Sequence, residues 1–227
     1  MDSEPGVSSR LALFPVSFFS VTMGLGGLAL ATRKMESALG LPGAVFWGVL
    51  GVDIAVFTAL ILLYAAKVSL YPKDALREMR HPVKMSFAPS VSIGMVLISA
   101  ALIDSVPGVS RALWLAGAGL QLILSLAIMR EWVVRDHFEI VHASPSWFIP
   151  AVGNLVVPLA GMRFAPLDVS WFYFSSGIVM WGVLLAIVLS RAIFHRSLPE
   201  KLLPTLFILM APPSVGFLVY VRLTGGL

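Results

Sequence analysis

The chain has 227 residues, of which 58% are hydrophobic and 12% are charged, and its mean hydropathy is +0.92. A soluble domain has about 45–50% apolar and about 25% charged residues, so this composition excludes a soluble globular protein and indicates an integral membrane protein. The formal net charge is +4, and the absence of cysteine excludes disulfide bonds and thiolate metal sites.

Seven apolar stretches follow one another along the chain. About 20 helical residues cover the roughly 30 Å of the hydrocarbon layer, so most of these stretches are long enough to cross a membrane. We predict an all-α integral membrane protein in which residues 1–227 form a single transmembrane domain. The predicted spans cover residues of about 11–31, 44–66, 86–103, 111–129, 147–162, 169–190 and 203–221.

Basic residues are distributed unevenly between the two sides that these spans define. The N-terminus and the segments after spans two, four and six hold 11 lysines and arginines, whereas the other side holds five. Because lysine and arginine accumulate in cytoplasmic loops, the N-terminus is predicted to be cytoplasmic. The 11 residues are Arg10, Lys67, Lys73, Arg77, Arg80, Lys84, Arg130, Arg135, Arg191, Arg196 and Lys201.

Prolines divide the spans by parity, because only the odd-numbered spans carry them inside. An interior proline removes a backbone hydrogen bond, and broken backbone at membrane depth is tolerated only against protein or a water-filled cavity. The pattern predicts kinked inner odd spans around a pore and outer even spans in lipid. Packing alone is the competing interpretation, since proline and glycine are common in membrane helices. The prolines are Pro15, Pro89, Pro150, Pro158, Pro212 and Pro213.

The membrane-depth polar side chains of the odd spans are hydroxyls and amides, whereas a cation pore would more naturally show carboxylates. Basic or titratable groups precede each odd span, and such a collar raises the local concentration of anions, although ordinary positive-inside bias also explains it. The candidate pore or kink residues are Pro15, Phe18, Ser20, Gly24, Pro89, Ser92, Pro150, Asn154, Pro212 and Pro213. The candidate residues of the cytoplasmic mouth are Arg10, His81, Lys84 and His142.

Two buried polar residues and one short motif remain. Asp53 lies deep in span two and is a candidate proton relay, although a protonated or hydrogen-bonded packing residue is the favoured interpretation. Gln121 is expected to hydrogen-bond between helices. Glu139 and His142 have the spacing of a carboxylate metal site, but a di-iron bundle needs a second such pair. We therefore predict no metal, no cofactor, no enzymatic activity and no nucleic-acid partner.

Four stretches in order resemble the tellurite-resistance and dicarboxylate transporter family, which includes TehA and the slow-type anion channels of plants. They are FPVSFFSVTMGLGGLAL at 14–30, HPVKMSFAPSVSI at 81–93, HASPSWFIPAVGNLVVPLAG at 142–161 and LPTLFILMAPPSVGFL at 203–218. The resemblance implies ten helices in five hairpins, kinked odd helices around an anion pore, and a homotrimer. By residue, it places the kinks at Pro15, Pro89, Pro150 and the Pro212–Pro213 pair.

The sequence departs from the family pattern, because only seven of ten helices are present. We expect the chain to be a fragment of a longer protein; otherwise a closed pore needs another element. The family's gate is a phenylalanine on the ninth helix, so no residue here takes that role. The resemblance implies a bacterial inner-membrane channel or channel-like transporter for small inorganic or organic anions. The alternative is a proton-coupled exporter or importer of a C4-dicarboxylate, sulfite or tellurite-type anion.

Overall fold

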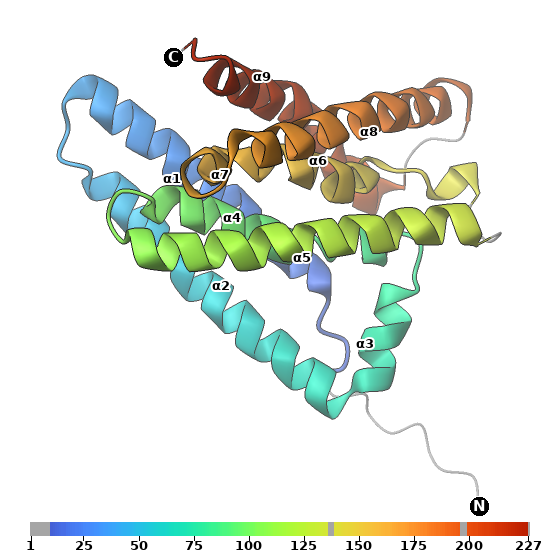
Figure 1. The fold of residues 1–227 in the computed structure, drawn as a ribbon. Helices are drawn as coiled ribbons and strands as arrows, with labels where there is room; N and C mark the ends of the chain where they lie inside the picture. The colour runs from blue at the N-terminus through green and yellow to red at the C-terminus, as the bar shows by residue number, and fades with distance from the viewer. Residues whose placement is uncertain (1–9, 136–138, 196–198, 227) are drawn as a thin grey trace, which may run out of the picture.

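The computed structural model describes residues 10–135, 139–195 and 199–226, which form α-helices joined by short 3-10 helices and turns (Figure 1). The α-helices are α1 (Ser20–Leu39), α2 (Ala44–Leu70), α3 (Pro72–Met79), α4 (Ser90–Leu102), α5 (Pro107–Val134), α6 (Phe148–Val156), α7 (Pro158–Phe164), α8 (Leu167–Phe194) and α9 (Ala211–Leu223). The 3-10 helices are η1 (Val16–Phe19), η2 (Lys84–Phe87), η3 (Ile140–His142), η4 (Pro145–Trp147) and η5 (Glu200–Met210).

Within these residues, seven helical stretches are long and apolar enough to cross a membrane, which confirms the predicted all-α membrane fold. Several helices extend beyond the predicted spans because polar flanking residues continue them past the apolar stretch. The spans are Val16–Leu39, Ala44–Leu70, Lys84–Leu102, Pro107–Val134, Pro145–Phe164, Leu167–Phe194 and Leu202–Leu223. The short helix α3, between spans two and three, was not predicted.

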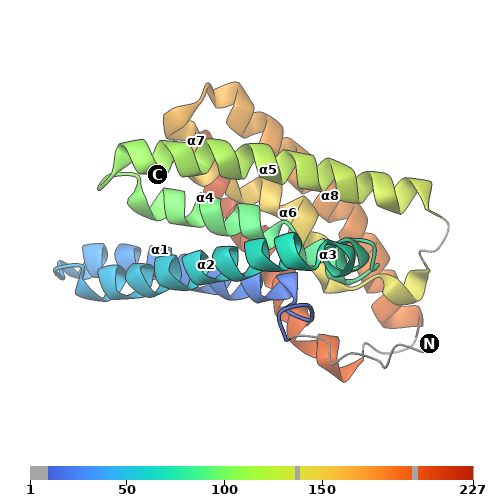
Figure 2. The ribbon, with the colours of Figure 1, turned by 90° about the horizontal axis from the view of Figure 1, so that it is seen from below.

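Consecutive spans pair as hairpins, α1 with α2, α4 with α5, and the α6–α7 segment with α8. The first helices of the hairpins also contact one another in the order α1, α4, α6 and α9, and so form a row (Figures 1 and 2). Each of α2, α5 and α8 contacts its hairpin partner and the next helix of the row. Helices adjacent in the row are therefore held together by the second helix of each hairpin.

The burial of the spans agrees only in part with the predicted division into inner odd and outer even spans. In spans three and five, 83% of the residues in the apolar stretch are buried, against 17% to 33% in the other five spans. Spans three and five are thus interior, as the proline pattern predicted. Spans one and seven differ from that prediction, because they lie at the two ends of the row. Each therefore has another helix of the row on one side only.

The prolines of the odd spans lie mostly where an α-helix begins within its span, close to the end of a 3-10 helix, and whether they kink the spans stays a prediction. Pro15 is extended backbone before η1, and Pro89 separates η2 from α4. Pro150 is in the first turn of α6, and Pro212 with Pro213 is in the first turn of α9. Proline costs little there, because the first N–H groups of a helix have no intrahelical partner.

Span five is also interrupted within its buried length. Pro158 begins α7 and divides the span from α6. Trp114 of α5 reaches this break, where its indole Nε1 donates a hydrogen bond to the carbonyl oxygen of Val157 at 3.0 Å. The indole therefore satisfies backbone at membrane depth, where water is absent.

Candidate functional site

Four 3-10 helices meet at one end of the row of inner helices. Contacts join η1 to η2, η2 to η4, and η4 to η5. The α-helices that follow them, α1, α4, α6 and α9, run in roughly the same direction in Figure 1. The N-terminus of an α-helix carries about half a positive elementary charge, because its first N–H groups have no intrahelical partner. The positive ends of the four α-helix dipoles therefore point toward the same end of the bundle, although the first N–H groups of α1, α6 and α9 donate to carbonyl oxygens of the preceding 3-10 helices.

Hydroxyl groups at these helix starts bond to carbonyl oxygens one turn earlier. Ser20 Oγ donates to the carbonyl oxygen of Ser17 at 2.6 Å, and Ser214 Oγ donates to that of Met210 at 2.8 Å. Serine and threonine side chains satisfy freed backbone groups in this way where membrane helices are broken. Hydroxyl groups without a formal charge therefore lie at the starts of α1 and α9.

A buried ion pair holds the chain on both sides of Pro15. Lys67 Nζ lies 2.6 Å from Glu78 Oε2, and both side chains are almost wholly buried. Lys67 Nζ also donates to the carbonyl oxygen of Phe14 at 2.7 Å, and the N–H of Val16 donates to Glu78 Oε1 at 2.8 Å. Charged groups from α2 and α3 therefore fix the extended backbone that begins span one.

Gln121 of α5 links the two interior spans. Its Oε1 accepts from Ser92 Oγ at 2.7 Å, and its Nε2 donates to the carbonyl oxygen of Pro150 and to Ser125 Oγ, both at 3.0 Å. Nε2 also lies 3.4 Å from Asn154 Oδ1. This confirms that Gln121 hydrogen-bonds between helices. Ser92 and Asn154 are bonded toward α5 in this structure, and their place in a pore stays a prediction.

Asp53 lies between α1, α2 and α4. Its side chain is fully buried, and neither carboxylate oxygen has a hydrogen-bond partner among the described residues. A Cβ atom built on Gly26 would lie 3.2 Å from Asp53 Oδ2 and 2.9 Å from Leu97 Cβ, so only glycine leaves room for the carboxyl group there. The hydrogen-bonded packing role is therefore not seen for Asp53 among the described residues. Its role as a proton relay stays a prediction.

Three of the residues predicted for the cytoplasmic mouth lie near one another around η2 and η3, and their role as a mouth stays a prediction. Burial lowers the pKa of His81, and the nearby positive charges of Lys84 and His142 lower this pKa further. His81 Nδ1 accepts a hydrogen bond from the N–H of Val83 at 3.2 Å. Arg10 is exposed near the start of the described chain. Three of the four predicted mouth residues therefore influence one another electrostatically.

Glu139 and His142 have a local structural role. The Glu139 side chain caps the N-terminus of η3, and His142 Nδ1 accepts from the N–H of Glu139 at 3.1 Å. Within the described residues, no group of three histidine, aspartate or glutamate side chains is arranged to hold a metal ion. The three-residue spacing of Glu139 and His142 is therefore that of a capping box, in which each side chain bonds to the backbone of the other residue.

The predicted pore residues differ widely in exposure. Phe18, Gly24 and Pro213 are exposed, and no heavy atom outside its local backbone lies within 4 Å of a Cβ built on Gly24. Pro15 and Ser20 are half-buried. The buried members are Pro89, Ser92, Pro150, Asn154 and Pro212. That these residues line one pore stays a prediction.

Ser86 was missed by sequence reasoning. It lies in η2, its side chain is fully buried, and its Oγ has no hydrogen-bond partner in the part of the chain that the structure describes. The sequence offered one indication of its burial, because Ser86 is the first residue of predicted span three. Because η2 contacts both η1 and η4, Ser86 belongs to the group of helix starts described above.

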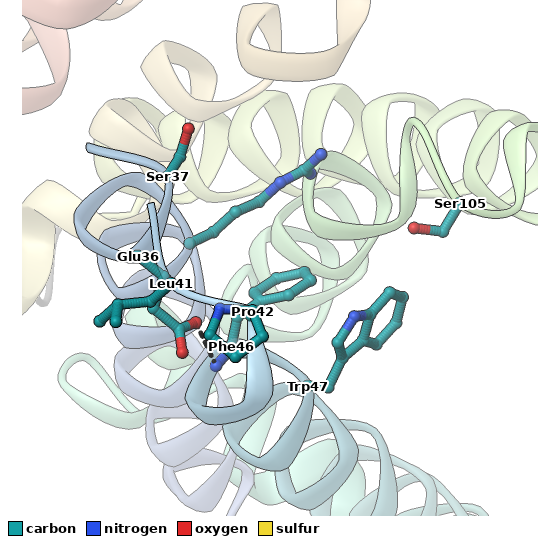
Figure 3. A pocket seen from close by; sticks show the side chains of 9 residues that line it. Glu36, Ser37, Leu41, Pro42, Phe46, Trp47 and Ser105 are labelled. Carbon is teal, nitrogen blue, oxygen red and sulfur yellow. Dashed lines mark hydrogen bonds between the residues drawn. The ribbon is translucent and has the colours of Figure 1, made fainter. Parts of the chain in front are cut away.

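A cavity of about 350 Å³ lies at the opposite end of the first hairpin (Figure 3). There the carboxylate of Glu36 accepts from the N–H groups of Val45 and Phe46, both at 2.9 Å, and so caps α2. Arg33 Nη2 lies 2.5 Å from Asp104 Oδ2. These charged groups already form a helix cap and an ion pair. We therefore interpret the cavity as part of the turn between α1 and α2 and not as a ligand site.

Comparison with known proteins gives relatives over nearly the whole chain. A transporter of Methanocaldococcus jannaschii is 27% identical over 229 residues, which are 96% of this chain and 67% of that protein. The tellurite resistance protein TehA homolog of Haemophilus influenzae is 27% identical over 216 residues, 93% of this chain and 65% of that protein. The guard cell S-type anion channel SLAC1 of Arabidopsis thaliana is 25% identical over 226 residues, which are 95% of this chain and 40% of that protein.

The chain therefore spans about two thirds of the length of these two prokaryotic relatives. A family model described as SLAC1, voltage-dependent anion channel, matches residues 13–227. This match covers all seven spans and the four converging helix starts. The chain belongs to the voltage-dependent anion channel family.

Proposed function

We propose that the protein conducts small anions along a pathway that starts at the four converging helix starts. One observation carries this proposal: α1, α4, α6 and α9 point their N-termini toward the same end of the bundle (Figure 1), where His81, Lys84 and His142 lie near one another around η2, which contacts η1 and η4. Helix N-termini and basic side chains both attract anions and repel cations. Conduction would proceed down the electrochemical gradient of the anion.

The middle of each odd span supports the same proposal. No Asp, Glu, Lys or Arg occurs in residues 17–31, 85–102, 145–162 or 202–221. A pathway along these segments would offer an ion hydroxyl groups and backbone dipoles in place of water, with no fixed charge that binds the anion tightly. Such weak coordination allows an anion to pass through and does not hold it at a tight binding site. The names of the plant relatives also speak for anion conduction.

We infer a homotrimer in a bacterial inner membrane, with the N-terminus in the cytoplasm. The resemblance to bacterial TehA supports the trimer, and 11 against five basic residues support the orientation. Identities of 25–27% leave the choice among tellurite-type, organic and inorganic anions to experiment. Chemical cross-linking in native membranes tests the trimer, and a tag-accessibility assay at the N-terminus tests the orientation.

The test of anion conduction is a chloride and nitrate flux assay on the full-length polypeptide in proteoliposomes. We expect anion currents with negligible potassium current. The Lys84→Gln variant is expected to lower the anion current several-fold at about 10 mM salt, where the Debye length is about 30 Å, and to match the parent at about 1 M.

The matched control is Lys34→Gln, which removes an exposed lysine near the opposite end of α1. It is expected to leave the current entering from the N-terminal side unchanged. Potassium currents of equal size, or a Lys84 effect that persists at high salt, would contradict the proposal.

A proton-coupled anion carrier is the second candidate function, and Asp53 favours it. A fully buried carboxyl group without a hydrogen-bond partner among the described residues is a suitable place to take up and release a proton. The carrier requires that protonation of Asp53 accompanies each transport cycle. A channel has no such requirement.

Replacing Asp53 with asparagine separates the two functions. As a channel, the Asp53→Asn protein is expected to retain anion current within about twofold, because the neutral amide occupies the same space beside Gly26. The measurement is anion uptake with and without an imposed pH gradient. Loss of pH-driven uptake, with the folded protein recovered in normal amount, would establish the carrier and refute simple conduction.

A further inference from the structure

A groove of about 400 Å³ lies between α3 and the C-terminal half of α5, next to η2 and the start of α4. Its floor consists of the buried side chains of Met85, Ala88 and Ile128. Apolar side chains from both helices form its walls. They are Leu76 and Met79 of α3 and Leu124 and Ala127 of α5. The groove is therefore an apolar crevice between two helices.

Charged side chains from α3 and from the C-terminal end of α5 also line this crevice. Arg80, Arg130 and Arg135 line it with a single carboxylate, that of Glu131, so three positive charges less one negative leave an excess of two. Glu131 pairs with both Arg130 and Arg135. Arg80 is exposed at the C-terminal end of α3, and its side chain makes no ion pair or hydrogen bond within the described residues.

The position of the groove suits a lipid. α5 spans the membrane, and its charged C-terminal turn follows directly on the apolar stretch that ends near Ile128. α3 is a short amphipathic helix with exposed Leu76 on one side and the exposed, charged Arg77 on another, as in helices that lie at the membrane surface. Apolar walls beside a charged helix end match the chemistry of a phospholipid, whose acyl chains adjoin a charged headgroup.

We propose that this groove binds one phospholipid with an anionic headgroup. The phosphate lies among Arg80, Arg130 and Arg135, and one acyl chain lies along Leu124 and Ala127. Arginine suits this role because its planar guanidinium bonds two phosphate oxygens at once. Basic pockets between membrane helices on the cytoplasmic side are a known type of site for anionic headgroups. A bound lipid would link α3, and through Glu78 the start of span one, to α5.

The test compares phosphatidylglycerol with phosphatidylcholine of the same chain length, added to the protein in neutral detergent and followed by native mass spectrometry. We expect one phosphatidylglycerol to be retained and phosphatidylcholine to be lost. In the Arg80→Gln/Arg130→Gln variant, affinity for phosphatidylglycerol is expected to fall about 30-fold, because each arginine near an anionic lipid contributes about a factor of five.

The matched control is Lys73→Gln/Arg77→Gln, which removes two exposed charges from α3 that do not line the groove. It is expected to retain the lipid. Ala127→Phe tests the acyl-chain contact, because it fills the wall of the groove without a change in charge, and it is expected to abolish retention. Equal loss in the control, equal retention of phosphatidylcholine, or competition by inorganic phosphate alone would overturn the proposal.

Discussion

Replacement of Lys67 with methionine is expected to lower the free energy of unfolding by about 3–5 kcal/mol, the usual cost of leaving one partner of a buried ion pair alone. The substitution leaves Glu78 buried without its cation and the carbonyl oxygen of Phe14 without its donor. The backbone around Pro15 then loses one of its two hydrogen bonds to this ion pair and keeps the bond from Val16 to Glu78. Chemical denaturation in detergent micelles, followed by tryptophan fluorescence, measures the change.

Lys73→Met is the matched control, since Lys73 is exposed on the neighbouring helix α3 and is expected to change stability by less than about 0.5 kcal/mol. In the Lys67→Met/Glu78→Gln double variant, the cost is expected to be smaller than the sum of the two single costs, because the partners act as a unit. Additive effects, or a Lys67→Met cost no larger than that of Lys73→Met, would show that the pair does not hold the start of span one.

Replacement of Gly153 with alanine is expected to destabilise the protein by about 1–3 kcal/mol, as overpacking does in a dense core. A Cβ atom at this position would lie 2.4 Å from Gln121 Nε2 and 2.8 Å from Ile93 Cδ1. The amide of Gln121 would have to move, and its hydrogen bond to the carbonyl oxygen of Pro150 would be lost. Thermal unfolding in detergent gives the size of this effect.

The same substitution at Gly119 has the opposite expected sign. Gly119 is exposed on α5, and no atom lies within 4 Å of a Cβ built there. Alanine is therefore expected to stabilise the helix by about 0.5–1 kcal/mol through its higher helix propensity. If Gly153→Ala also raised the unfolding temperature, close packing of α6 on α5 would not be the reason for glycine at that position.

The proline pattern was a sound guide to the interior position of spans three and five, while the kinks that it predicts stay a prediction. It placed spans three and five in the interior, where 83% of their apolar stretches are buried. It also assigned kinks to Pro89 and Pro150, which the structure places at helix starts. A sequence gives the position of a proline but not the residue at which the helix begins, and the two together decide whether a hydrogen bond is lost.

Among the residues of the candidate site, too, some features could be predicted from the sequence and others could not. His81, Lys84 and His142 were predicted from charge, and their mutual influence follows from lying near one another at η2 and η3. Lys67 was counted as a loop cation, yet it is buried against Glu78, 11 residues later. No local pattern distinguishes a buried lysine at a helix end from an exposed one, because the difference lies in what packs against it.

Composition and order of residues determined the membrane-spanning class, the number of crossings in the described chain and the polar, uncharged character of the odd spans, because hydropathy and charge act on each segment alone. Tertiary packing decided which groups satisfy the backbone at Pro15 and Pro158, which face of α5 holds Gln121, and where an apolar groove meets three arginines. These features depend on contacts between helices far apart in sequence. Such contacts are set by the geometry of the hairpins and not by the periodicity of any one helix.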